Sequence, residues 1–410
     1  MAKTNHFGVP AAAAGALVAV GLLLLIMLVV VKVRPAEATF PGKNGKIVYS
    51  GRDAPNGDYE IYTINPGGGG KVQLTDNTTN DYDPSYSPSG MKIAYSGKDA
   101  PNGDWEIYTI KPGGGGKVQL TDNTTSDFQP SYSPSGKKIA YSGFDGKDYE
   151  IYTIKVGGGG KFKVTDNATN DQAPSYSPSG KKIVYSGDEG NDYEIYTIKA
   201  GGGGKFKVTD NATEEFYSSY SPDGKKIAYS GEDGLNGDFE VYTIKPGGGG
   251  KVKVTDNSAD DGYGGLSYSP SGKKIVFSGQ DGPNGDYEIY TINAGGGGKF
   301  KVTDNGTEEY FSSYSPNGKK IAYSGEEGTN GDWEIYTIEP GGGGKFKVTD
   351  NTTDDDGGLS YSPSGKKIVY SGKDAPNGDY EIYTIKPGGG GKFKVTDNGT
   401  GDYEPSWGSS

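Results

Sequence analysis

Residues 84–121 read "PSYSPSGMKIAYSGKDAPNGDWEIYTIKPGGGGKVQLT", and this stretch decides the fold. It holds four short runs rich in Tyr, Ile, Val and Thr: "PSYS" (84–87), "KIAYS" (92–96), "WEIYTI" (105–110) and "KVQLT" (117–121). Connections rich in Gly, Pro, Asn and Asp separate them, which is typical of β-strands joined by turns. Because no stretch after the first 40 residues shows the apolar period of a helix, we predict an all-β chain.

This four-strand unit is repeated along the chain. The phrase "IYTI" (once "VYTI") recurs at intervals of 46, 44, 44, 46, 48, 46 and 47 residues, beginning at Ile61, Ile107, Ile151, Ile195, Val241, Ile289, Ile335 and Ile382. Four short antiparallel strands in about 40 to 50 residues are typical of a β-propeller blade. We therefore predict an eight-bladed β-propeller of four-stranded antiparallel blades; the alternatives are an open solenoid or two small propellers.

The two ends of the repeat region indicate how the ring closes. The first unit begins at "GKIVYS" (45–50) with no "PSYS" strand before it, whereas "EPSWGSS" (404–410) adds one such strand at the C-terminus. A C-terminal strand that completes the first blade leaves no open sheet edge. We expect the propeller to be closed in this way.

The repeat "PSYSPSGKKIAYSG…DYEIYTIKPGGGGKVQLTD" resembles the WD40-like (PD40) propeller repeat of TolB and related secreted bacterial proteins, over residues 42–410. The resemblance implies a TolB-like propeller in an exported protein. TolB also carries a separate N-terminal α/β domain, which we do not expect in this chain. The resemblance therefore bears on the fold and leaves the partner open.

The N-terminal segment differs from the repeats. Residues 9–31 are uncharged, with basic residues on both sides, and this run is long enough to span a bilayer as a helix. The Ala-Glu-Ala sequence at 36–38 fits a signal-peptide cleavage site. We expect residues 1–38 to be a cleaved signal peptide or an N-terminal membrane anchor, and 39–410 to be the propeller. The protein would then be extracytoplasmic, secreted or anchored, and would meet a membrane only through this segment.

The charges separate between the two faces of the predicted ring. With the first strand of each unit innermost, the loops between units and the loops between second and third strands share one face, here called the top face. After the leader, all acidic residues but Asp223 and Glu339 fall in or beside these loops. Most basic residues fall on the bottom face, the top-face exceptions being Arg52, Lys98, Lys147 and Lys373. An acidic top face favours a cationic partner such as a basic peptide, and we expect no nucleic acid partner.

One top-face position is acidic in every unit. Six residues after the Thr of each "TD" pair lie Asp81, Asp127, Asp171, Glu215, Asp261, Glu309, Asp355 and Asp402. The next residue is aromatic in five units: Tyr82, Phe128, Phe216, Tyr310 and Tyr403. We predict a ring of carboxylates and aromatics at the mouth of the central channel that binds cations, a basic peptide or stacked sugars. In the alternative, each carboxylate caps its own turn and each aromatic covers a blade edge.

The loops between second and third strands carry a candidate cation site. Oxygen clusters such as Asp53 with Asp58, and Asp99 with Asp104, suit Ca²⁺. The Asn-Gly pair in the same loops is instead a strong hairpin signal, and both hypotheses remain open. The aspartates of the "TD" pairs, beginning with Asp76, we expect to be structural, in Asx-type turns.

The composition limits the chemistry. The chain has no cysteine, and its one histidine, His6, lies in the leader. Ser-His-Asp and Cys-His nucleophiles and His/Cys zinc sites are therefore excluded, while catalysis by a carboxylate pair stays possible. Because the acids repeat eightfold, no unit stands out as catalytic. We predict a non-enzymatic binding scaffold for a protein, peptide or cation, with no cofactor other than Ca²⁺. The alternatives are a carbohydrate- or calcium-binding lectin-like propeller and a carboxylate-dependent hydrolase or lyase.

The runs of four glycines do not form a phosphate-binding loop. In the first unit, Asn65 occupies the position of the first P-loop glycine, and Val72 follows the lysine where Ser or Thr is required. We expect "PGGGG" to be the hairpin between third and fourth strands, where glycine permits positive φ.

Overall fold

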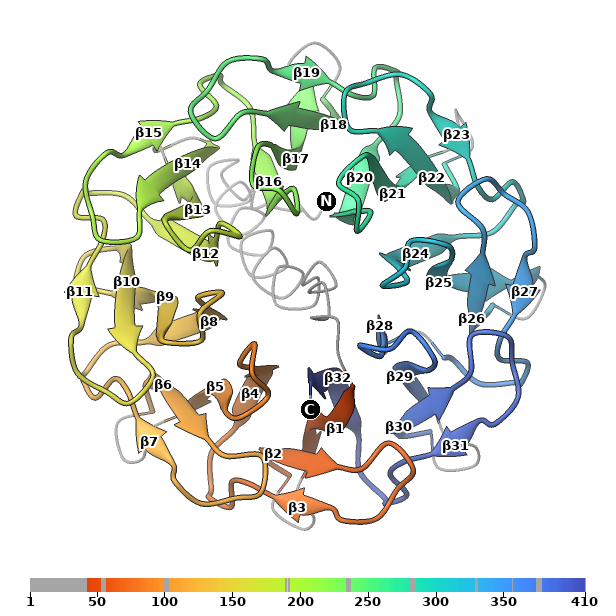
Figure 1. Cartoon of the computed structure of the whole chain (residues 1–410), viewed down its shortest axis with the longest axis horizontal. Helices are drawn as coiled ribbons and strands as arrows, with labels where there is room; N and C mark the ends of the chain where they lie inside the picture. The colour runs from red at the N-terminus through yellow and green to blue at the C-terminus, as the bar shows by residue number, and fades with distance from the viewer. Residues whose placement is uncertain are drawn as a thin grey trace, which may run out of the picture.

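The computed structural model describes residues 43–52, 57–98, 103–188, 190, 192–233, 237–280, 285–328, 331–355, 357–373 and 378–409. Within them the chain forms eight four-stranded antiparallel sheets arranged as a ring (Figure 1). The eight-bladed propeller predicted from the repeats is confirmed. The predicted leader, residues 1–38, lies outside the described residues. Among the described residues, no helix has the length and hydrophobicity needed to cross a membrane.

Each blade consists of strands A to D, with A innermost and D outermost (Figure 1). In blades 1 to 8 the A strands are β32 (Asp402–Ser409), β4 (Asp81–Tyr86), β8 (Asp127–Tyr132), β12 (Asp171–Tyr176), β16 (Glu215–Tyr220), β20 (Asp261–Tyr268), β24 (Glu309–Tyr314) and β28 (Gly357–Tyr361). The B strands are β1 (Asn44–Arg52), β5 (Ile93–Lys98), β9 (Lys138–Phe144), β13 (Lys182–Asp188), β17 (Ile227–Asp233), β21 (Lys274–Gln280), β25 (Ile321–Glu327) and β29 (Ile368–Lys373).

The outer two strands complete each blade. The C strands are β2 (Tyr59–Ile64), β6 (Trp105–Ile110), β10 (Tyr149–Lys155), β14 (Tyr193–Lys199), β18 (Asp238–Ile244), β22 (Tyr287–Asn293), β26 (Asp332–Ile338) and β30 (Tyr380–Ile385). The D strands are only two residues long: β3 (Val72–Gln73), β7 (Val118–Gln119), β11 (Phe162–Lys163), β15 (Phe206–Lys207), β19 (Val252–Lys253), β23 (Phe300–Lys301), β27 (Phe346–Lys347) and β31 (Phe393–Lys394). Such short outer strands offer little free edge for pairing with another chain.

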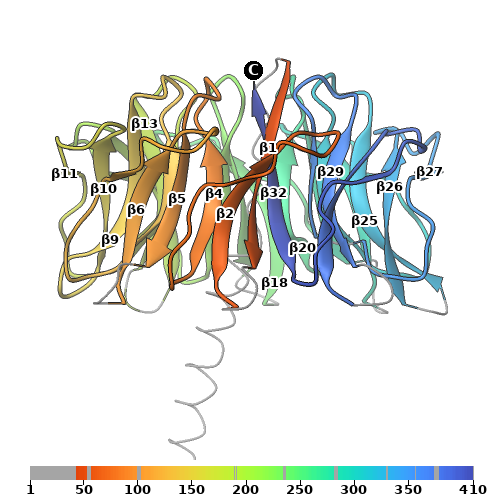
Figure 2. The same cartoon turned by 90° about the horizontal axis from the view of Figure 1, so that it is seen from below.

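The ring closes through the last strand of the chain. β32 pairs with β1, with Ile47 opposite Trp407 and Val48 opposite Ser406. The Trp407 indole Nε1 also donates a hydrogen bond to the carbonyl oxygen of Ser360 in blade 8, at 3.2 Å. Figure 2 shows β1 and β32 side by side, with the strands running through the thickness of the ring. The predicted closure is confirmed.

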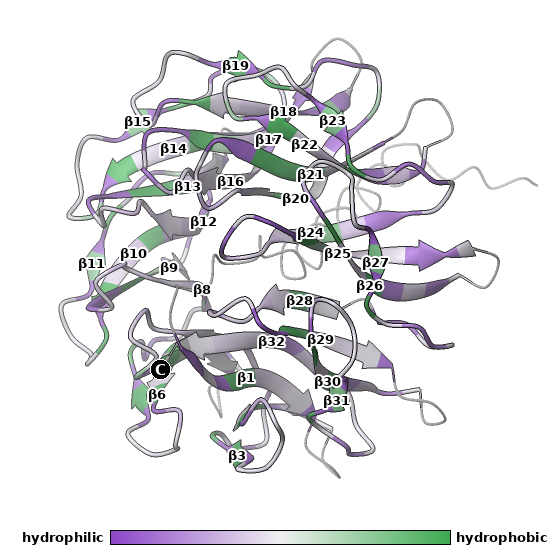
Figure 3. Ribbon diagram, turned by 45° about the vertical axis from the view of Figure 1, so that its right-hand side comes forward, coloured by the Kyte–Doolittle hydropathy of each residue, from purple (hydrophilic) through white to green (hydrophobic). Residues whose placement is uncertain are grey.

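The hydrophobic core lies between neighbouring blades. Between blades 1 and 2, for example, Val48 and Ile61 pack with Ile93 and Tyr95, and all four are fully buried. Burial of each such side chain contributes about 1.5 to 3 kcal/mol. Hydrophobic segments accordingly fall on the strands, while the loops are mainly hydrophilic (Figure 3). Every blade needs its neighbours, because no sheet covers its own apolar face.

The glycine runs form the turns between strands C and D, as predicted. In blade 1 the Gly68 amide donates to the Asn65 carbonyl oxygen at 2.9 Å, and φ of Gly68 is 72°. A Cβ atom on Gly68 would lie 2.7 Å from the ring of Phe393 in blade 8. The second glycine of the run is therefore required both by its backbone conformation and by the neighbouring blade.

Candidate functional site

The eight carboxylates predicted to bind a ligand at the channel mouth are buried. Strand A begins three residues earlier than predicted, so that seven of them are its first residue, and Asp355 lies two residues before β28. A Cβ atom on Gly97 would approach Asp81 Oδ1 to 2.3 Å, because the carboxyl group occupies the space beside this glycine. Asp81 Oδ2 accepts a hydrogen bond from Asn77 Nδ2 at 2.9 Å, as the turn-capping alternative requires. Only 0 or 1 % of each residue is exposed: Asp81, Asp127, Asp171, Glu215, Asp261, Glu309, Asp355 and Asp402.

Each of these acids lies near a second buried carboxylate from strand C of the preceding blade. The Asn77 amide donates to Glu60 Oε1 at 2.6 Å while the Asn77 side chain contacts Asp81. Burial raises the pKa of both Glu60 and Asp81. Burial likewise raises the pKa of Glu106 to about 7. The strand C acids are fully buried in all eight blades: Glu60, Glu106, Glu150, Glu194, Glu240, Glu288, Glu334 and Glu381.

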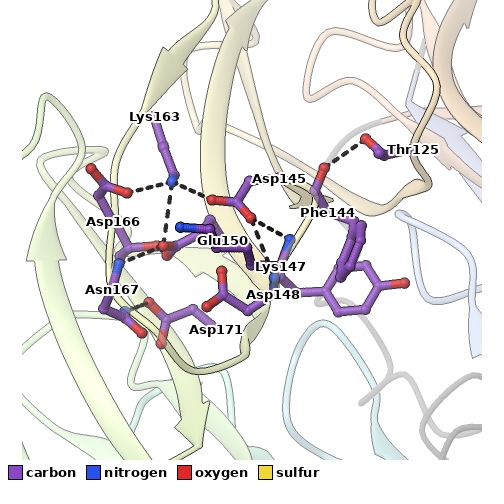
Figure 4. A network of polar contacts seen from close by, with 12 residues as sticks. Thr125, Phe144, Asp145, Lys147, Asp148, Glu150, Lys163, Asp166, Asn167 and Asp171 are labelled. Carbon is purple, nitrogen blue, oxygen red and sulfur yellow. Dashed lines mark hydrogen bonds and ion pairs between the residues drawn. The ribbon is translucent and has the colours of Figure 1, made fainter.

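Lysines of strand D neutralise many of these acids. In blade 3, Lys163 Nζ lies 2.5 Å from Asp166 Oδ1, 2.8 Å from Asp145 Oδ2 and 3.5 Å from Glu150 Oε1 (Figure 4). The sequence assigned such lysines to the bottom face, but the extended side chain reaches carboxylates of the top loops. The charges of the two faces are therefore less separated than predicted. The equivalent lysines pair with the strand C acid in blades 4 to 8: Lys207, Lys253, Lys301, Lys347 and Lys394.

Blades 1 and 2 lack this lysine. Gln73 pairs opposite Tyr62, and Gln119 opposite Tyr108, in the register that Lys163 occupies opposite Tyr152. The buried Glu60 and Glu106 therefore have no strand D ammonium group beside them. This difference breaks the eightfold symmetry of the polar network.

In two groups of described residues, three carboxylates lie close enough together to hold a metal ion, but a lysine already lies among them. Oxygen atoms of Asp145, Glu150 and Asp166 lie within 4.8 Å of one another, as do those of a second group in blade 7, but Lys163 and Lys347 lie among them. Of the four predicted Ca²⁺ ligands, Asp53 and Asp99 lie outside the described residues, and Asp104 is half-buried.

Asp58 is the predicted ligand that best fits a cation. It is 9 % exposed, and among the described residues neither of its two buried carboxylate oxygens has a hydrogen-bond partner. A buried carboxylate without a donor is costly unless it is protonated or a cation neutralises it. Its equivalents Asp238 and Asp379 have the same two orphaned oxygens.

The predicted aromatic residues are half-buried on the top face, and each contacts aromatic rings of strand C in its own blade or the preceding one. Tyr82 of strand A packs against Tyr59 of the preceding blade (ring centroids 4.9 Å apart) and against Trp105 of its own blade (5.7 Å). Tyr403 extends this chain, because it lies 6.0 Å from Tyr59 and 5.1 Å from Tyr380. Shorter chains join Phe128 to Tyr149, Phe216 to Tyr193 and Phe239, and Tyr310 to Tyr287 and Trp333.

Three of the top-face cations lie over these rings, which the sequence reasoning did not find. The Arg52 guanidinium lies 5.1 Å from the centroid of the Tyr59 ring, and Lys98 Nζ lies 5.6 Å from that of Trp105. Lys373 Nζ lies 5.6 Å from the centroid of Tyr380. Each cation lies opposite its aromatic residue in the pairing of strands B and C. The register of these two strands would therefore have predicted the contact.

A second set of unpredicted residues lies on the inner strands. Two residues after the ring carboxylate, strand A bulges, and non-glycine residues there adopt φ of 54 to 57°. Such left-handed conformations are uncommon and often mark functional positions. This position differs between otherwise similar blades: Asp83, Gln129, Ala173, Tyr217, Phe311 and Glu404. The variation between repeats was the signal available in the sequence.

Comparisons with known proteins agree with this architecture. The family model of the TolB beta propeller domain matches residues 99–258 and 234–410. A search of the curated proteins gave no match.

Solved structures with this fold include several classes of protein. Dipeptidyl peptidase 4 from Porphyromonas gingivalis is similar with a TM-score of 0.62 and 13% identity, covering 87% of this chain and 60% of that protein. Oligogalacturonate lyase from Vibrio parahaemolyticus gives 0.56 and 13%, covering 84% and 98%. TolB from Acinetobacter baumannii gives 0.43 and 18%, covering 81% and 82%. At these identities, the first two similarities show the fold alone.

Proposed function

The chain belongs to the TolB β-propeller family, and from that premise we propose that it is a non-catalytic, exported binding scaffold that recognises a protein or peptide through its top face. The observation that carries this proposal is the set of half-buried aromatic chains on that face, such as Tyr59–Tyr82–Trp105. Aromatic side chains with a buried side and an accessible side are enriched in protein interfaces.

The buried acids support a scaffold more than an enzyme. Asp81 and its equivalents recur in every blade with the same asparagine or glycine neighbours, and each is closed off from solvent. A catalytic acid has to reach its substrate, and a catalytic pair requires two carboxyl groups in different environments. Both acids of each buried pair, such as Glu60 and Asp81, are closed off from solvent, so that neither could reach a substrate.

A peptide panel tests the proposal. Immobilised full-length protein would be incubated with fluorescein-labelled basic, neutral and acidic octapeptides in 20 mM NaCl. We expect retention of basic peptides, which the variant Tyr82→Ala weakens and the bottom-face variant Lys137→Ala leaves unchanged. If no peptide of any charge is retained, the proposed function is wrong.

A calcium-binding lectin-like propeller is the second candidate, because no donor in the described part of the chain reaches the two buried carboxylate oxygens of Asp58. In this case Ca²⁺ at millimolar concentration would raise the melting temperature of the wild-type protein, and Asp58→Asn would reduce that increase. A glycan array with and without Ca²⁺ would then identify sugar ligands. Unchanged melting of the wild-type protein in Ca²⁺ would exclude this candidate.

A further inference from the structure

The position opposite the strand C aromatic differs in charge around the ring. In blades 8, 1 and 2 it holds Lys373, Arg52 and Lys98, and each cation lies over its ring. In blades 5 and 7 the same register places Glu232 opposite Phe239 and Glu326 opposite Trp333. Blades 5 and 7 thus keep the aromatic ring and exchange the cation beside it for a carboxylate.

A second position, in the loop that enters each of these blades, is also acidic there and neutral in blade 2. Where the loop before blade 2 presents Asn80 to the amide of Tyr59, the loops before blades 5 and 7 present Glu214 to Tyr193 and Glu308 to Tyr287. The Glu308 carboxylate also accepts a hydrogen bond from the Tyr310 hydroxyl at 2.7 Å. The loops that enter blades 5 and 7 thus carry a negative charge where the loop that enters blade 2 has the neutral Asn80.

The top loops of these two blades carry no cation of their own, although Lys253 and Lys347 of strand D contact other acids of the same blades. The loops at 210–218, 232–238, 304–312 and 326–332 contain no lysine or arginine, but several Asp and Glu residues. Trp333 and Phe239 are half-buried, and among the described residues no cation lies over either ring. An aromatic face next to a carboxylate attracts an ammonium or guanidinium group through both its quadrupole and its charge.

We propose that blades 5 and 7 bind lysine or arginine side chains of a basic segment of a partner protein. Each bound side chain lies over the strand C ring, Phe239 or Trp333. It also lies beside Glu232 or Glu326, the carboxylate that stands where blades 8, 1 and 2 have a cation of the chain itself. This inference rests on the proposed function and names its partner class. Blades 8, 1 and 2 display the same contact made within the chain. A nucleic acid does not fit, because the carboxylates would repel its phosphates.

The experiment compares two variants with the same change of charge. Binding of a fluorescein-labelled (Arg-Gly)₄ peptide to the full chain would be measured by anisotropy in 20 mM and 150 mM NaCl, with (Glu-Gly)₄ as the control peptide. Glu326→Lys gives blade 7 the cation of blade 2, and Glu339→Lys makes the same change on the bottom face. Lys98 beside Trp105 shows that lysine is accommodated at this register.

We expect Glu326→Lys to weaken (Arg-Gly)₄ binding at least tenfold and Glu339→Lys less than twofold, with the reciprocal Lys98→Glu strengthening it. As a second readout, the peptide should change the tryptophan emission of Trp105→Phe, which retains Trp333, but not that of Trp333→Phe. Equal effects of Glu326→Lys and Glu339→Lys, or equal binding of (Glu-Gly)₄, would overturn the inference while leaving a peptide-binding scaffold intact. If the wild-type protein binds neither peptide, the proposed function itself fails.

Discussion

Restoring the missing lysine of blade 2 should stabilise the protein, and more so above neutral pH. Glu106 is fully buried, and burial raises its pKa from 4.5 to about 7. In blade 3 the equivalent acid, Glu150, has Lys163 Nζ at 3.5 Å, whereas blade 2 has Gln119 at that register. The variant Gln119→Lys places an ammonium group where Glu106 has none.

The sign of the pH dependence follows from the direction of the pKa shift. Because the folded state holds the Glu106 proton more tightly than the unfolded state, this group's contribution to stability is greatest below pH 4.5 and falls as pH rises to about 7. At 1.36 kcal/mol per pKa unit, the loss amounts to about 3 kcal/mol. A half-buried lysine at 3.5 Å, screened by partial solvent exposure, should recover about 1 to 2 kcal/mol of it.

The assay is urea unfolding followed by circular dichroism at pH 5 and pH 8. We expect Gln119→Lys to raise the unfolding midpoint at pH 8 and to change it much less at pH 5, where Glu106 is already protonated in the folded state. Lys163→Gln in blade 3 should lower the midpoint at both pH values, because Lys163 also pairs with Asp145 and Asp166. The uncharged control Gln119→Met should have no pH-dependent effect. Equal shifts of Gln119→Lys at both pH values, or the same shifts from Gln119→Met, would refute the electrostatic explanation.

Three further outcomes test the packing. Gly68→Ala should destabilise the fold by about 2 kcal/mol, because φ of Gly68 is positive and the new Cβ would meet Phe393. Thermal melting measures this, with the neighbouring Gly67→Ala as the control, since a Cβ on Gly67 has no atom within 4 Å. Trp407→Ala should lower the free energy of unfolding by about 3 to 5 kcal/mol and loosen the ring closure. Limited proteolysis would detect this as cleavage near the C-terminus, and a digestion pattern identical to that of the wild-type protein would contradict it. Tyr95→Phe should leave the free energy of unfolding nearly unchanged or raise it, because the buried hydroxyl of Tyr95 has no hydrogen-bond partner among the described residues; a loss above about 2 kcal/mol in urea unfolding would show that the hydroxyl is hydrogen-bonded in solution.

The architecture could be predicted from the amino-acid sequence. Strand-sized apolar runs, turn residues at fixed spacings and the displaced "EPSWGSS" strand were sufficient to predict eight blades and their closure. These features are local, because backbone turns and the alternation of buried side chains are set within a few residues. The D strands were predicted longer than they are, since strand ends depend on pairing partners rather than on composition.

The positions of the charged groups depend on the packing of the strands and blades. The ring carboxylates were predicted to bind a ligand at the channel mouth or to cap their own turns, and a strand A that starts at Asp81 rather than at Pro84 carries them inside the blades. Lys163 and its equivalents had been placed on the opposite face, yet their long side chains reach the top-loop acids. The cations over Tyr59, Trp105 and Tyr380 depend on the register between two strands. Sequence periodicity fixes which residues repeat, whereas burial and partners depend on contacts between strands and between blades, which no single repeat contains.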